Sequence, residues 1–510
     1  MLLYLTVGAV SLLGCAQQPP PSIVSTTASP VEAGMVPGTE DQARRTSAAL
    51  DALFADPALT HAFVAARVES LADGRTLYAR NAGARVVPAS TMKIVTTAVA
   101  AERLGWDFRF ETRLEMTGAI RDGVLHGDLV VTGGGDPSVS AQGMDTPPLF
   151  IEWRERLRKA GIDRVEGRLV GDDNAFDDQT LGAGWAWDYL TAGYAAPSSA
   201  LSYNENVAVM RISPGPAIGD AARVDLGPPG HGLDLTNAVA TSASEVPASI
   251  AFERLPGSTA LRVRGSTPVG APTLVLTTTV VNPTRYFVEA LRLALQARGL
   301  HVSGGSWDIG DVETPPVLPA GERRVLATRY SQPLSVLIGY AMKVSQNFYG
   351  DMLLKAIGAH ATAAPGGETV GSLETGRTAV RETLMAWGLP VDTLAMYDGS
   401  GLSRYSYASA DLLVGVLKHA WHDERLRGPF AASLPVGGRD GTLENRMRNT
   451  TLDRRVQAKT GTIANVRSLA GYAETAAGEK LVFAIVANHF AAPNADVDRV
   501  METALEELVK

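Results

Sequence analysis

The sequence contains one cysteine, Cys15, in 510 residues. A single cysteine excludes an internal disulfide and any metal site built from several thiolates. The chain also lacks an excess of basic residues, because 46 Lys and Arg stand against 54 Asp and Glu and leave a formal net charge of −8. Proteins that bind nucleic acid normally present a basic surface, so nucleic acid is not an expected partner.

Sequence signatures of metal and nucleotide chemistry are missing as well. The histidines, including His126, His301, His419 and His422, show no metal-ligand spacing, and no H-E-x-x-H, Walker A or G-x-S-x-G stretch occurs. We therefore expect neither a metal ion nor a cofactor. The composition is that of a globular protein, with 45% hydrophobic and 20% charged residues, and its 51 Gly and 29 Pro predict many turns and strand ends.

An apolar run opens the chain at residues 2–14 (LLYLTVGAVSLLG). It is too short to span a bilayer but has the length of the apolar core of a signal peptide. The run ends at Leu12-Leu13-Gly14-Cys15, which resembles the lipobox of bacterial lipoproteins. An ordinary signal peptide that happens to contain a cysteine is the alternative.

The lipobox resemblance implies a lipoprotein signal peptide at residues 1–15, cleaved to leave a lipidated Cys15. The protein would then face the periplasm with a lipid anchor in a membrane. Ala16 rather than Asp follows the cysteine, which in such lipoproteins points to the outer membrane. Residues 16–40 are rich in Pro, Ser, Thr and Gln, a composition typical of a flexible tether.

The next part of the chain changes from mixed to β-type patterns. Helices are predicted over 44–54 and after Pro88, with a hairpin over 61–80 that turns at Asp73-Gly74. From 106 to 320, short β-type runs separated by Gly/Pro turns dominate, with one clear helix at 285–298.

The last part is helical again and ends in two strands and a helix. Helical patterns cover 334–359 and 376–387, and β-runs at 468–474 and 480–489 precede an amphipathic helix at 494–510, for which Asn494 is the predicted cap. A terminal helix beside two adjacent strands predicts an α+β fold, with a sheet covered by helices.

Three short motifs have chemical meaning. They are S-x-x-K and K-T-G, which occur once each, and S-x-N, which occurs twice: Ser90–Lys93, Lys459–Gly461, Ser202–Asn204 and Ser345–Asn347. Each alone has an ordinary structural explanation, because Ser commonly caps a helix and Gly commonly lies in a turn beside a strand.

Ser90 and Lys93 share a face at the start of the predicted helix, because positions i and i+3 are neighbours. A serine hydroxyl is a weak nucleophile until a base removes its proton. Lysine becomes such a base when burial and a neighbouring cation lower its pKa. The N–H groups of a first helical turn are unpaired, so the Ser90 N–H is a candidate oxyanion donor.

The stretch Lys459-Thr460-Gly461-Thr462 lies just before the β-run at 468–474, where the pattern indicates a strand and a turn. Lys binds a carboxylate by charge and Thr binds it by donating from its hydroxyl. Gly permits a close approach of the backbone to a ligand. The motif therefore favours a binding site for a carboxylate.

The order S-x-x-K, S-x-N, K-T-G is the set typical of penicillin-binding proteins and β-lactamases. Over residues 45–510 the sequence resembles the low-molecular-mass class C penicillin-binding proteins, the D-alanyl-D-alanine carboxypeptidase/endopeptidase family. Members of that family have sequence segments similar to further stretches of this chain: Pro88–Lys93, Gly133–Pro137, Leu201–Asn206, Asp398–Arg404 and Asp440–Leu443.

The resemblance implies a penicillin-binding/β-lactamase-like transpeptidase fold, an antiparallel sheet covered by helices with β-rich inserted subdomains. Residues 41–105 and 321–510 would form the DD-peptidase catalytic domain, and 106–320 the insertion. Its implied function is a serine DD-peptidase that hydrolyses D-Ala-D-Ala or D-Ala–diamino-acid bonds of peptidoglycan peptides through an acyl-enzyme, and that β-lactams acylate. Because Ser202 falls in the insertion, Ser345 is the better candidate for the second motif.

The resemblance also implies the roles in catalysis. Ser90 attacks the carbonyl between two D-alanines, and Lys93 acts as its base. Ser345 passes a proton to the leaving amine, with Lys459 stabilising its ionised form or sharing the relay.

Substrate binding falls to the remaining motif residues. Asn347 orients the base and holds the substrate amide, and the K-T-G stretch (Lys459, Thr460 and Gly461) with Thr462 holds the terminal carboxylate. The Thr462 N–H would be the second oxyanion donor.

Two other hypotheses remain open from the sequence. One is a β-lactamase or esterase on the same fold, against which the long insertion argues. The other is a catalytically idle peptidoglycan-binding lipoprotein, against which the intact motifs argue. The preference between terminal D-Ala and cross-link is also open, because both cuts place the same D-Ala carbonyl at the same serine.

Overall fold

The computed structural model describes residues 37–140, 146–312, 323–361 and 370–510. Its contacts divide the chain into residues 1–44 and 45–510, and the fold below is that of the second unit. Cys15, the predicted signal peptide and most of the predicted tether lie outside the described residues. Within the described ranges, no helix has the length and apolar character needed to cross a membrane.

Helix α1 (Pro37–Leu53) begins earlier than predicted, inside the stretch expected to be tether. Proline is tolerated in the first turn of a helix because the N–H that it lacks would be unpaired there. The tether prediction is therefore wrong for residues 37–40, and for residues 16–36 it lies outside the described part of the chain.

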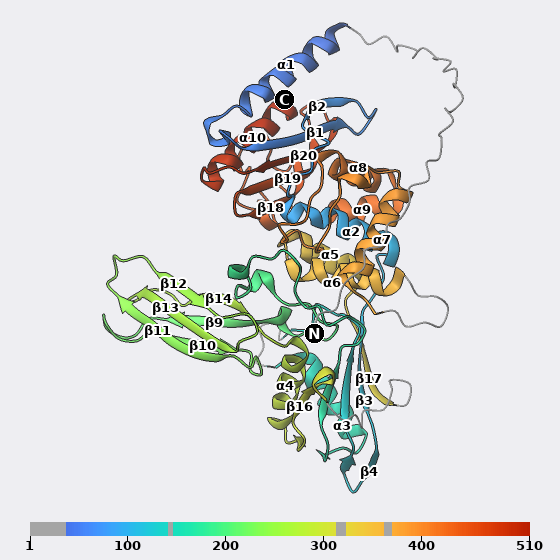
Figure 1. Cartoon of the computed structure of the whole chain (residues 1–510), viewed down its shortest axis with the longest axis vertical. Helices are drawn as coiled ribbons and strands as arrows, with labels where there is room; N and C mark the ends of the chain where they lie inside the picture. Colours follow the sequence, from blue (N-terminus) through green and yellow to red (C-terminus); the bar gives the residue numbers. More distant parts are fainter. Residues whose placement is uncertain (1–36, 141–145, 313–322, 362–369) are drawn as a thin grey trace, which may run out of the picture. The chain divides into compact units, whose positions relative to one another are not determined.

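A five-stranded antiparallel sheet, in the order β18-β19-β20-β1-β2, carries the K-T-G motif (Figure 1). It joins an N-terminal hairpin to three C-terminal strands: β1 (Phe63–Ser70), β2 (Thr76–Arg80), β18 (Val456–Ile463), β19 (Val466–Glu474) and β20 (Lys480–Asn488). Gly74, with a φ of 74°, lies in the turn of the hairpin, as the sequence predicted.

Both faces of this sheet are buried, because successive side chains of a strand point to opposite faces. In β20, Leu481, Phe483 and Ile485 pack with α1 and α10 (Asn494–Val509), whereas Val482 and Ala484 pack with the helices of the other face. The predicted sheet covered by helices is confirmed.

One detail of α10 differs from the prediction. Pro493 is the N-cap residue, with an extended ψ of 141°, and no side chain caps the helix. Asn494 is already the first helical residue, so its predicted capping role is wrong.

The helices that cover the second face surround the S-x-x-K motif. They are α2 (Met92–Leu104), α5 (Leu334–Lys343), α6 (Asn347–Ala361), α7 (Leu373–Ala386), α8 (Ala410–His422) and α9 (Glu424–Ser433). The helical stretch predicted over 334–359 is two helices, because the chain turns at 344–346, where Ser345 has a φ of 61°. This turn presents the second S-x-N motif.

Four further sheets of the described residues form the inserted region, with the orders β16-β8-β6-β3-β17, β15-β7-β5-β4, β10-β9-β14 and β11-β13-β12. Their strands are β3 (Glu111–Met116), β4 (Ala119–Arg121), β5 (Val124–His126), β6 (Leu129–Gly133), β7 (Arg164–Val165), β8 (Leu169–Asp172), β9 (Val207–Ser213), β10 (Arg223–Gly227), β11 (Asp234–Ser242), β12 (Ser249–Glu253), β13 (Ala260–Pro268), β14 (Leu274–Thr279), β15 (His301–Val302), β16 (Ser306–Asp308) and β17 (Arg324–Tyr330).

The inserted region ends later than the sequence suggested. β17 pairs antiparallel with β3, so the strand that leaves the insertion lies beside the strand that enters it (Figure 1). The sequence placed the return at 320, but the hydrogen-bonded sheet continues to Tyr330. Helices α3 (Pro148–Lys159) and α4 (Pro283–Gln296) pack on these strands, and α4 is the helix predicted at 285–298.

Candidate active site

Ser90 lies on one turn of 3-10 helix, Ala89–Thr91, that leads directly into α2. The turn is held by Thr91 Oγ1, which donates to the Pro88 carbonyl at 2.7 Å. Ala89 has a φ of 49°, a left-handed conformation that is uncommon for alanine. Such strain persists where the surroundings impose it, and it is frequent at functional sites.

Lys93 follows one turn later and is fully buried. Its Nζ lies 2.9 Å from Ser90 Oγ, 2.6 Å from Asn347 Oδ1 and 2.9 Å from the Ser400 carbonyl oxygen. The last two partners are acceptors only. A neutral amine has two N–H bonds and one lone pair, so these acceptors take both N–H bonds and leave the lone pair for the Ser90 hydroxyl.

The orientation of the Asn347 amide is set from the inserted region. Asn347 Nδ2 donates to the carbonyl of Tyr194 at 2.9 Å, and Tyr194 lies on the short helix Gly193–Ala195. The amide oxygen therefore faces Lys93, because the nitrogen is already engaged on the opposite side.

Ser345 and Lys459 form a second serine–lysine pair. Ser345 lies in the turn between α5 and α6, and Lys459 lies on β18 and is fully buried. Lys459 Nζ donates to Ser345 Oγ at 2.8 Å and to the Thr460 carbonyl at 2.7 Å. The structure thus brings the S-x-x-K, second S-x-N and K-T-G motifs together.

The first S-x-N stretch is elsewhere. Ser202 is buried in the inserted region, where its hydroxyl donates to the Ser199 carbonyl at 2.7 Å and accepts from Asn206 Nδ2 at 3.0 Å. Asn204 Nδ2 donates to the Val207 carbonyl. Both side chains hold a turn, and neither contacts Lys93.

Burial lowers the pKa of both lysines, but their neighbours differ. Desolvation lowers the pKa of Lys93 to about 8, and the nearby carboxyl groups of Asp351 and Asp398 act in the opposite direction. The pKa of Lys459 is lowered well below its usual range, first by burial and then by the charge of Lys93. The neighbouring cation expected for Lys93 is thus found acting on Lys459 instead.

Asp351 is a buried carboxyl group between these elements. Its Oδ1 accepts from the Gly399 and Ser400 N–H groups at 2.8 and 3.1 Å, whereas its Oδ2 has no hydrogen-bond partner. Burial, followed by the charge of Asp398, raises the pKa of Asp351 well above its usual range. The charge of Lys93 acts in the opposite direction and lowers the pKa of Asp351, so the two buried groups each favour the charged form of the other.

The glycine of K-T-G allows β18 to lie against the Ser90 turn. A Cβ on Gly461 would lie 2.1 Å from Ser468 Oγ, 2.8 Å from the Pro88 carbonyl and 3.0 Å from Ser90 N. The sequence predicted a close backbone approach to a ligand here. In the structure the close neighbour is the Ser90 turn itself, and the whole motif is strand rather than strand and turn.

The two threonines of this strand are placed differently. Thr460 is mostly buried, and its Oγ1 donates to Thr442 Oγ1 at 2.8 Å. Thr462 is exposed, and its Oγ1 accepts from Arg467. Only Thr462 therefore presents its side chain at the surface of the sheet edge.

The loop over 398–404, which in the sequence is only a stretch similar to the family, contributes the Ser400 carbonyl to Lys93. Asp398 organises this loop and is fully buried. Its carboxylate accepts from Trp185 Nε1 at 2.8 Å, from Gly401 N at 2.9 Å and from Ser403 N at 2.6 Å. A backbone carbonyl has no side-chain signature, which is why the motifs did not identify this contact.

A cluster with metal-ligand spacing occurs in the described residues at Glu102, His419 and Asp423. The Arg425 guanidinium binds both carboxylates, at 3.0 Å to Glu102 and 2.6 Å to Asp423. His419 stacks on Trp387 with ring centroids 3.9 Å apart. The cluster is therefore an ion-pair network.

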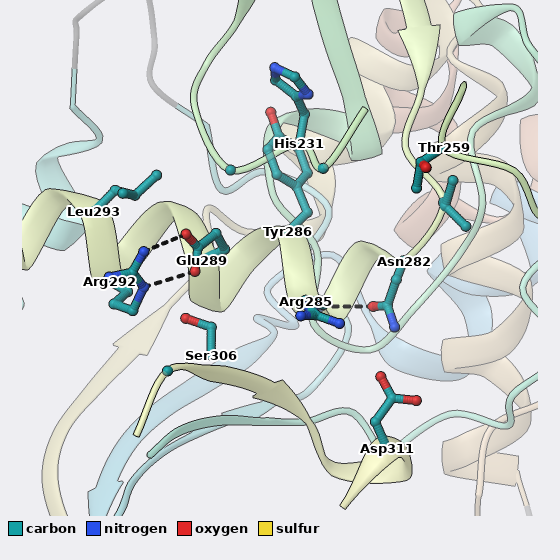
Figure 2. A pocket seen from close by; sticks show the side chains of 14 residues that line it. His231, Thr259, Asn282, Arg285, Tyr286, Glu289, Arg292, Leu293, Ser306 and Asp311 are labelled. Carbon is teal, nitrogen blue, oxygen red and sulfur yellow. Dashed lines mark hydrogen bonds and ion pairs between the residues drawn. The ribbon is translucent and has the colours of Figure 1, made fainter. Parts of the chain in front are cut away.

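A cavity of about 760 Å³ lies in the inserted region, along α4 and beside β16 (Figure 2). Figure 2 shows Arg292 paired with Glu289 on its wall, and His231 above Tyr286. None of the residues singled out in the sequence motifs lines this cavity, so it is separate from the site formed by the two serine–lysine pairs.

The comparisons with known proteins agree on one family. The sequence profile of the D-Ala-D-Ala carboxypeptidase 3 (S13) family matches residues 46–508. A D-alanyl-D-alanine carboxypeptidase of Actinomadura sp. (strain R39) is 34% identical over 456 residues, which cover 87% of this chain and 81% of that relative. The D-alanyl-D-alanine carboxypeptidase DacB of Haemophilus influenzae is 28% identical over 407 residues, covering 79% of this chain and 80% of that relative.

The fold has a match among solved structures. Penicillin-binding protein 4 (dacB) from Haemophilus influenzae superposes with a TM-score of 0.77 at 24% identity, covering 90% of this chain and 99% of that chain. The agreement over nearly the full length includes both the sheet with its helices and the inserted region.

Proposed function

This chain belongs to the D-Ala-D-Ala carboxypeptidase 3 (S13) family, and from that premise we propose how its own residues carry out the reaction. It is a serine-type D-Ala-D-Ala carboxypeptidase that acts through an acyl-enzyme and that β-lactams acylate. Its peptidoglycan peptide substrate lies outside the cytoplasm. The residue roles below are the proposal.

In the first step, Ser90 Oγ attacks the carbonyl carbon between the two D-alanines while its proton passes to neutral Lys93 Nζ. The two acceptor-only partners, Asn347 Oδ1 and the Ser400 carbonyl, hold the amine with its lone pair toward the hydroxyl. The developing oxyanion is held by the Ser90 and Thr462 N–H groups.

In the second step, the bond to the leaving nitrogen breaks as that nitrogen receives a proton. We assign the delivery to Ser345 Oγ, which recovers a proton from Lys459 Nζ 2.8 Å away. D-Ala leaves as a neutral amine, and the ester on Ser90 remains. The proton that Lys93 accepted in the first step passes to Lys459 and restores its protonated form, so that Lys93 is neutral again. Water then attacks this ester and gives a proton to Lys93, which returns that proton to Ser90 Oγ as the ester bond breaks.

Binding of the terminal carboxylate falls to the strand edge formed by Lys459, Thr460 and Thr462, with Gly461 letting that edge lie against the Ser90 turn. Asn347 Nδ2 has a second N–H, which does not bind the Tyr194 carbonyl, and this N–H holds the substrate amide. The carboxylate of a β-lactam is held in the same way, and its ring amide takes the place of the scissile bond. A solved structure of penicillin-binding protein 4 from Haemophilus influenzae holds a β-lactam.

The observation that carries the proposal is the contact between Lys93 Nζ and Ser90 Oγ at 2.9 Å, with the pKa of the lysine lowered to about 8. The test is labelling with a fluorescent penicillin, followed by identification of the labelled peptide. We expect covalent label on Ser90 in the native protein and none in Ser90→Ala. Label that survives the substitution would remove Ser90 from the nucleophile role.

The preferred bond is tested by the products. Mass analysis of muropeptides after digestion distinguishes release of terminal D-Ala from opening of the D-Ala–diamino-acid cross-link. The first outcome makes the enzyme a carboxypeptidase in the cell wall, and the second adds an endopeptidase activity.

We also propose that residues 1–15 are a lipoprotein signal peptide and that Cys15 carries a lipid anchor in the outer membrane, facing the periplasm. The proposal rests on the Leu12–Cys15 pattern after an apolar run. Metabolic labelling with a tagged fatty acid, with fractionation of the two membranes, should place the native protein in the outer membrane. Cys15→Ala should abolish the label.

The domain division is likewise a proposal. Residues 41–105 and 331–510 would form the catalytic domain, with the inserted subdomains between them. We place the end of the inserted region after Tyr330 instead of at 320, because β17 pairs with β3.

A further inference from the structure

Glu205 connects the inserted region to the second motif of the active site. It lies between Asn204 and Asn206, in the Leu201–Asn206 stretch to which the mechanism assigns no role. Its Oε1 accepts from the Tyr340 hydroxyl at 2.8 Å, and its Oε2 accepts from Gln346 Nε2. Tyr340 belongs to α5, and Gln346 is the middle residue of Ser345–Asn347.

The backbone around Glu205 adopts an uncommon left-handed conformation, and its side chain points from this turn toward Tyr340 and Gln346. Asn204, Glu205 and Asn206 have φ values of 51°, 54° and 56°. Asn tolerates this left-handed conformation, whereas Glu in it costs free energy and is uncommon. Such residues persist when the surroundings impose them, and they cluster at functional sites.

Hydrogen bonds within the insertion impose this turn. Asn206 Nδ2 donates to the Pro197 carbonyl at 2.8 Å, and Asn206 Oδ1 accepts from Tyr203 N at 3.1 Å. Asn204 N donates to the Val139 carbonyl at 2.8 Å. The carboxylate of Glu205 is therefore presented from a rigid base rather than from a free loop.

Gln346 transmits this position to the catalytic residues on either side of it. Its Oε1 accepts from Phe348 N at 3.4 Å in the first turn of α6, and its own N–H donates to the Ala341 carbonyl at 2.9 Å in α5. With Nε2 held by Glu205, the side chain of Gln346 joins α6 to the insertion, and its backbone N–H ties the same turn to α5. Ser345, with its positive φ, and Asn347 are the residues adjacent to it.

We propose that Glu205 is a positioning residue of this enzyme: the insertion holds the Ser345–Asn347 turn through its carboxylate. Together with the Tyr194 carbonyl on Asn347, this contact makes the insertion part of the active site rather than an appended module. Burial raises the pKa of Glu205, and the two donors favour its charged form. The proposal rests on the assigned roles of Ser345 and Asn347.

The test uses the full chain and a variant set that forms a cycle. Glu205→Ala removes the acceptor, and Gln346→Glu places a second carboxylate against Glu205. The double variant with Glu205→Gln and Gln346→Glu exchanges the two groups and restores one carboxylate facing one amide. Glu253→Ala, at an exposed position on β12, is the matched control.

We measure the rate constant for acylation by a fluorescent penicillin, kcat and KM for D-Ala release, and the thermal midpoint. We expect Glu205→Ala and Gln346→Glu each to lower the acylation rate and kcat about tenfold or more, with little change in KM. The exchanged pair should recover most of the rate, and Glu253→Ala should match the native protein.

Equal acylation rates in the native protein and both single variants would overturn the proposal. So would an exchanged pair that is as slow as the single variants, even if Glu205→Ala were unstable, because recovery requires the direct contact. Failure of the catalytic assignment itself is distinguishable: the native protein would then show no acylation of Ser90.

Discussion

The two serine–lysine pairs of the active site have nearly the same internal geometry and different surroundings. Lys93 lies 2.9 Å from Ser90, and Lys459 lies 2.8 Å from Ser345, and both lysines are fully buried. Lys93 lies near the carboxyl groups of Asp351 and Asp398, which oppose the effect of burial on its pKa. Lys459 has no such carboxyl group among the causes of its shift, and the charge of Lys93 lowers its pKa further.

In the proposed mechanism, this difference allows one pair of residue types to serve two roles. A base is most effective when its pKa lies near the working pH, and a pKa of about 8 places Lys93 there. Lys459 is held more strongly toward its neutral form until an anion arrives. A substrate carboxylate bound at β18 would raise the pKa of Lys459 again, so binding and proton delivery would be coupled at this second pair.

Replacement of the lysines should separate the two pairs most clearly. We expect Lys93→Met to lower the acylation rate about 10³-fold or more, because the base is lost. Lys459→Met should have a smaller effect, about 10²-fold, and should also raise KM, because the carboxylate loses its cation. Stopped-flow acylation with a penicillin and D-Ala release measure these values. Equal losses in both variants would contradict the division of roles.

The close contact between the two halves of the site depends on Gly461. Gly461→Ala would place a methyl group 2.1 Å from Ser468 Oγ and 3.0 Å from Ser90 N, so β18 or the Ser90 turn must move. We expect acylation to fall about a hundredfold. Gly428→Ala is the control, since its added methyl group would meet no atom within 4 Å. An unchanged acylation rate in Gly461→Ala would show that the approach is not required.

The serine of the second pair can be tested against the other S-x-N stretch. Ser345→Ala should still be labelled by penicillin at Ser90 but should lose about tenfold to a hundredfold in kcat, because proton delivery to the leaving amine is interrupted. Ser202→Ala should keep its activity and lose stability by about 1 kcal/mol, because its hydrogen bonds are structural. Thermal unfolding and D-Ala release distinguish the two.

The smallest expected effect concerns the carboxyl group beside Lys93. Lys93 acts as a base only when neutral, so acylation should rise with pH through about 8. Because Asp351 raises the pKa of Lys93, Asp351→Asn should lower that pKa and move the rising limb to lower pH, by about one unit or less. The acylation rate measured from pH 5 to about 10 tests this. Asp225→Asn, in the inserted region, should leave the profile in place, and a shift to higher pH in Asp351→Asn would contradict the assignment.

Local sequence patterns were sufficient to predict several elements of the fold. The hairpin around Gly74, the helix after Pro88 and the helix at α4 follow from turn residues and periodicity, and the structure confirms them. The predicted cap at Asn494 is wrong because Pro493 already takes the capping position, which a side-chain rule for Asn does not anticipate.

Contacts made by the backbone were not predictable in the same way. The Ser400 and Tyr194 carbonyls orient Lys93 and Asn347, and any residue type could supply such an oxygen. Likewise Asp398 is an ordinary turn residue in the sequence. Only the folded loop shows that its carboxylate accepts hydrogen bonds from Trp185, Gly401 and Ser403.

By itself the sequence determined which residue types are the candidates for the chemistry, because a nucleophile, a base and a carboxylate site require particular side chains at short local spacings: Ser90 with Lys93, and Lys459 with Thr460. Only the tertiary structure decided which S-x-N stretch joins them, where the insertion closes, and how differently the two lysines titrate. The physical reason is that pKa values and hydrogen-bond partners depend on burial and on neighbours distant in the chain, such as Asp351 beside Lys93 and Glu205 beside Gln346.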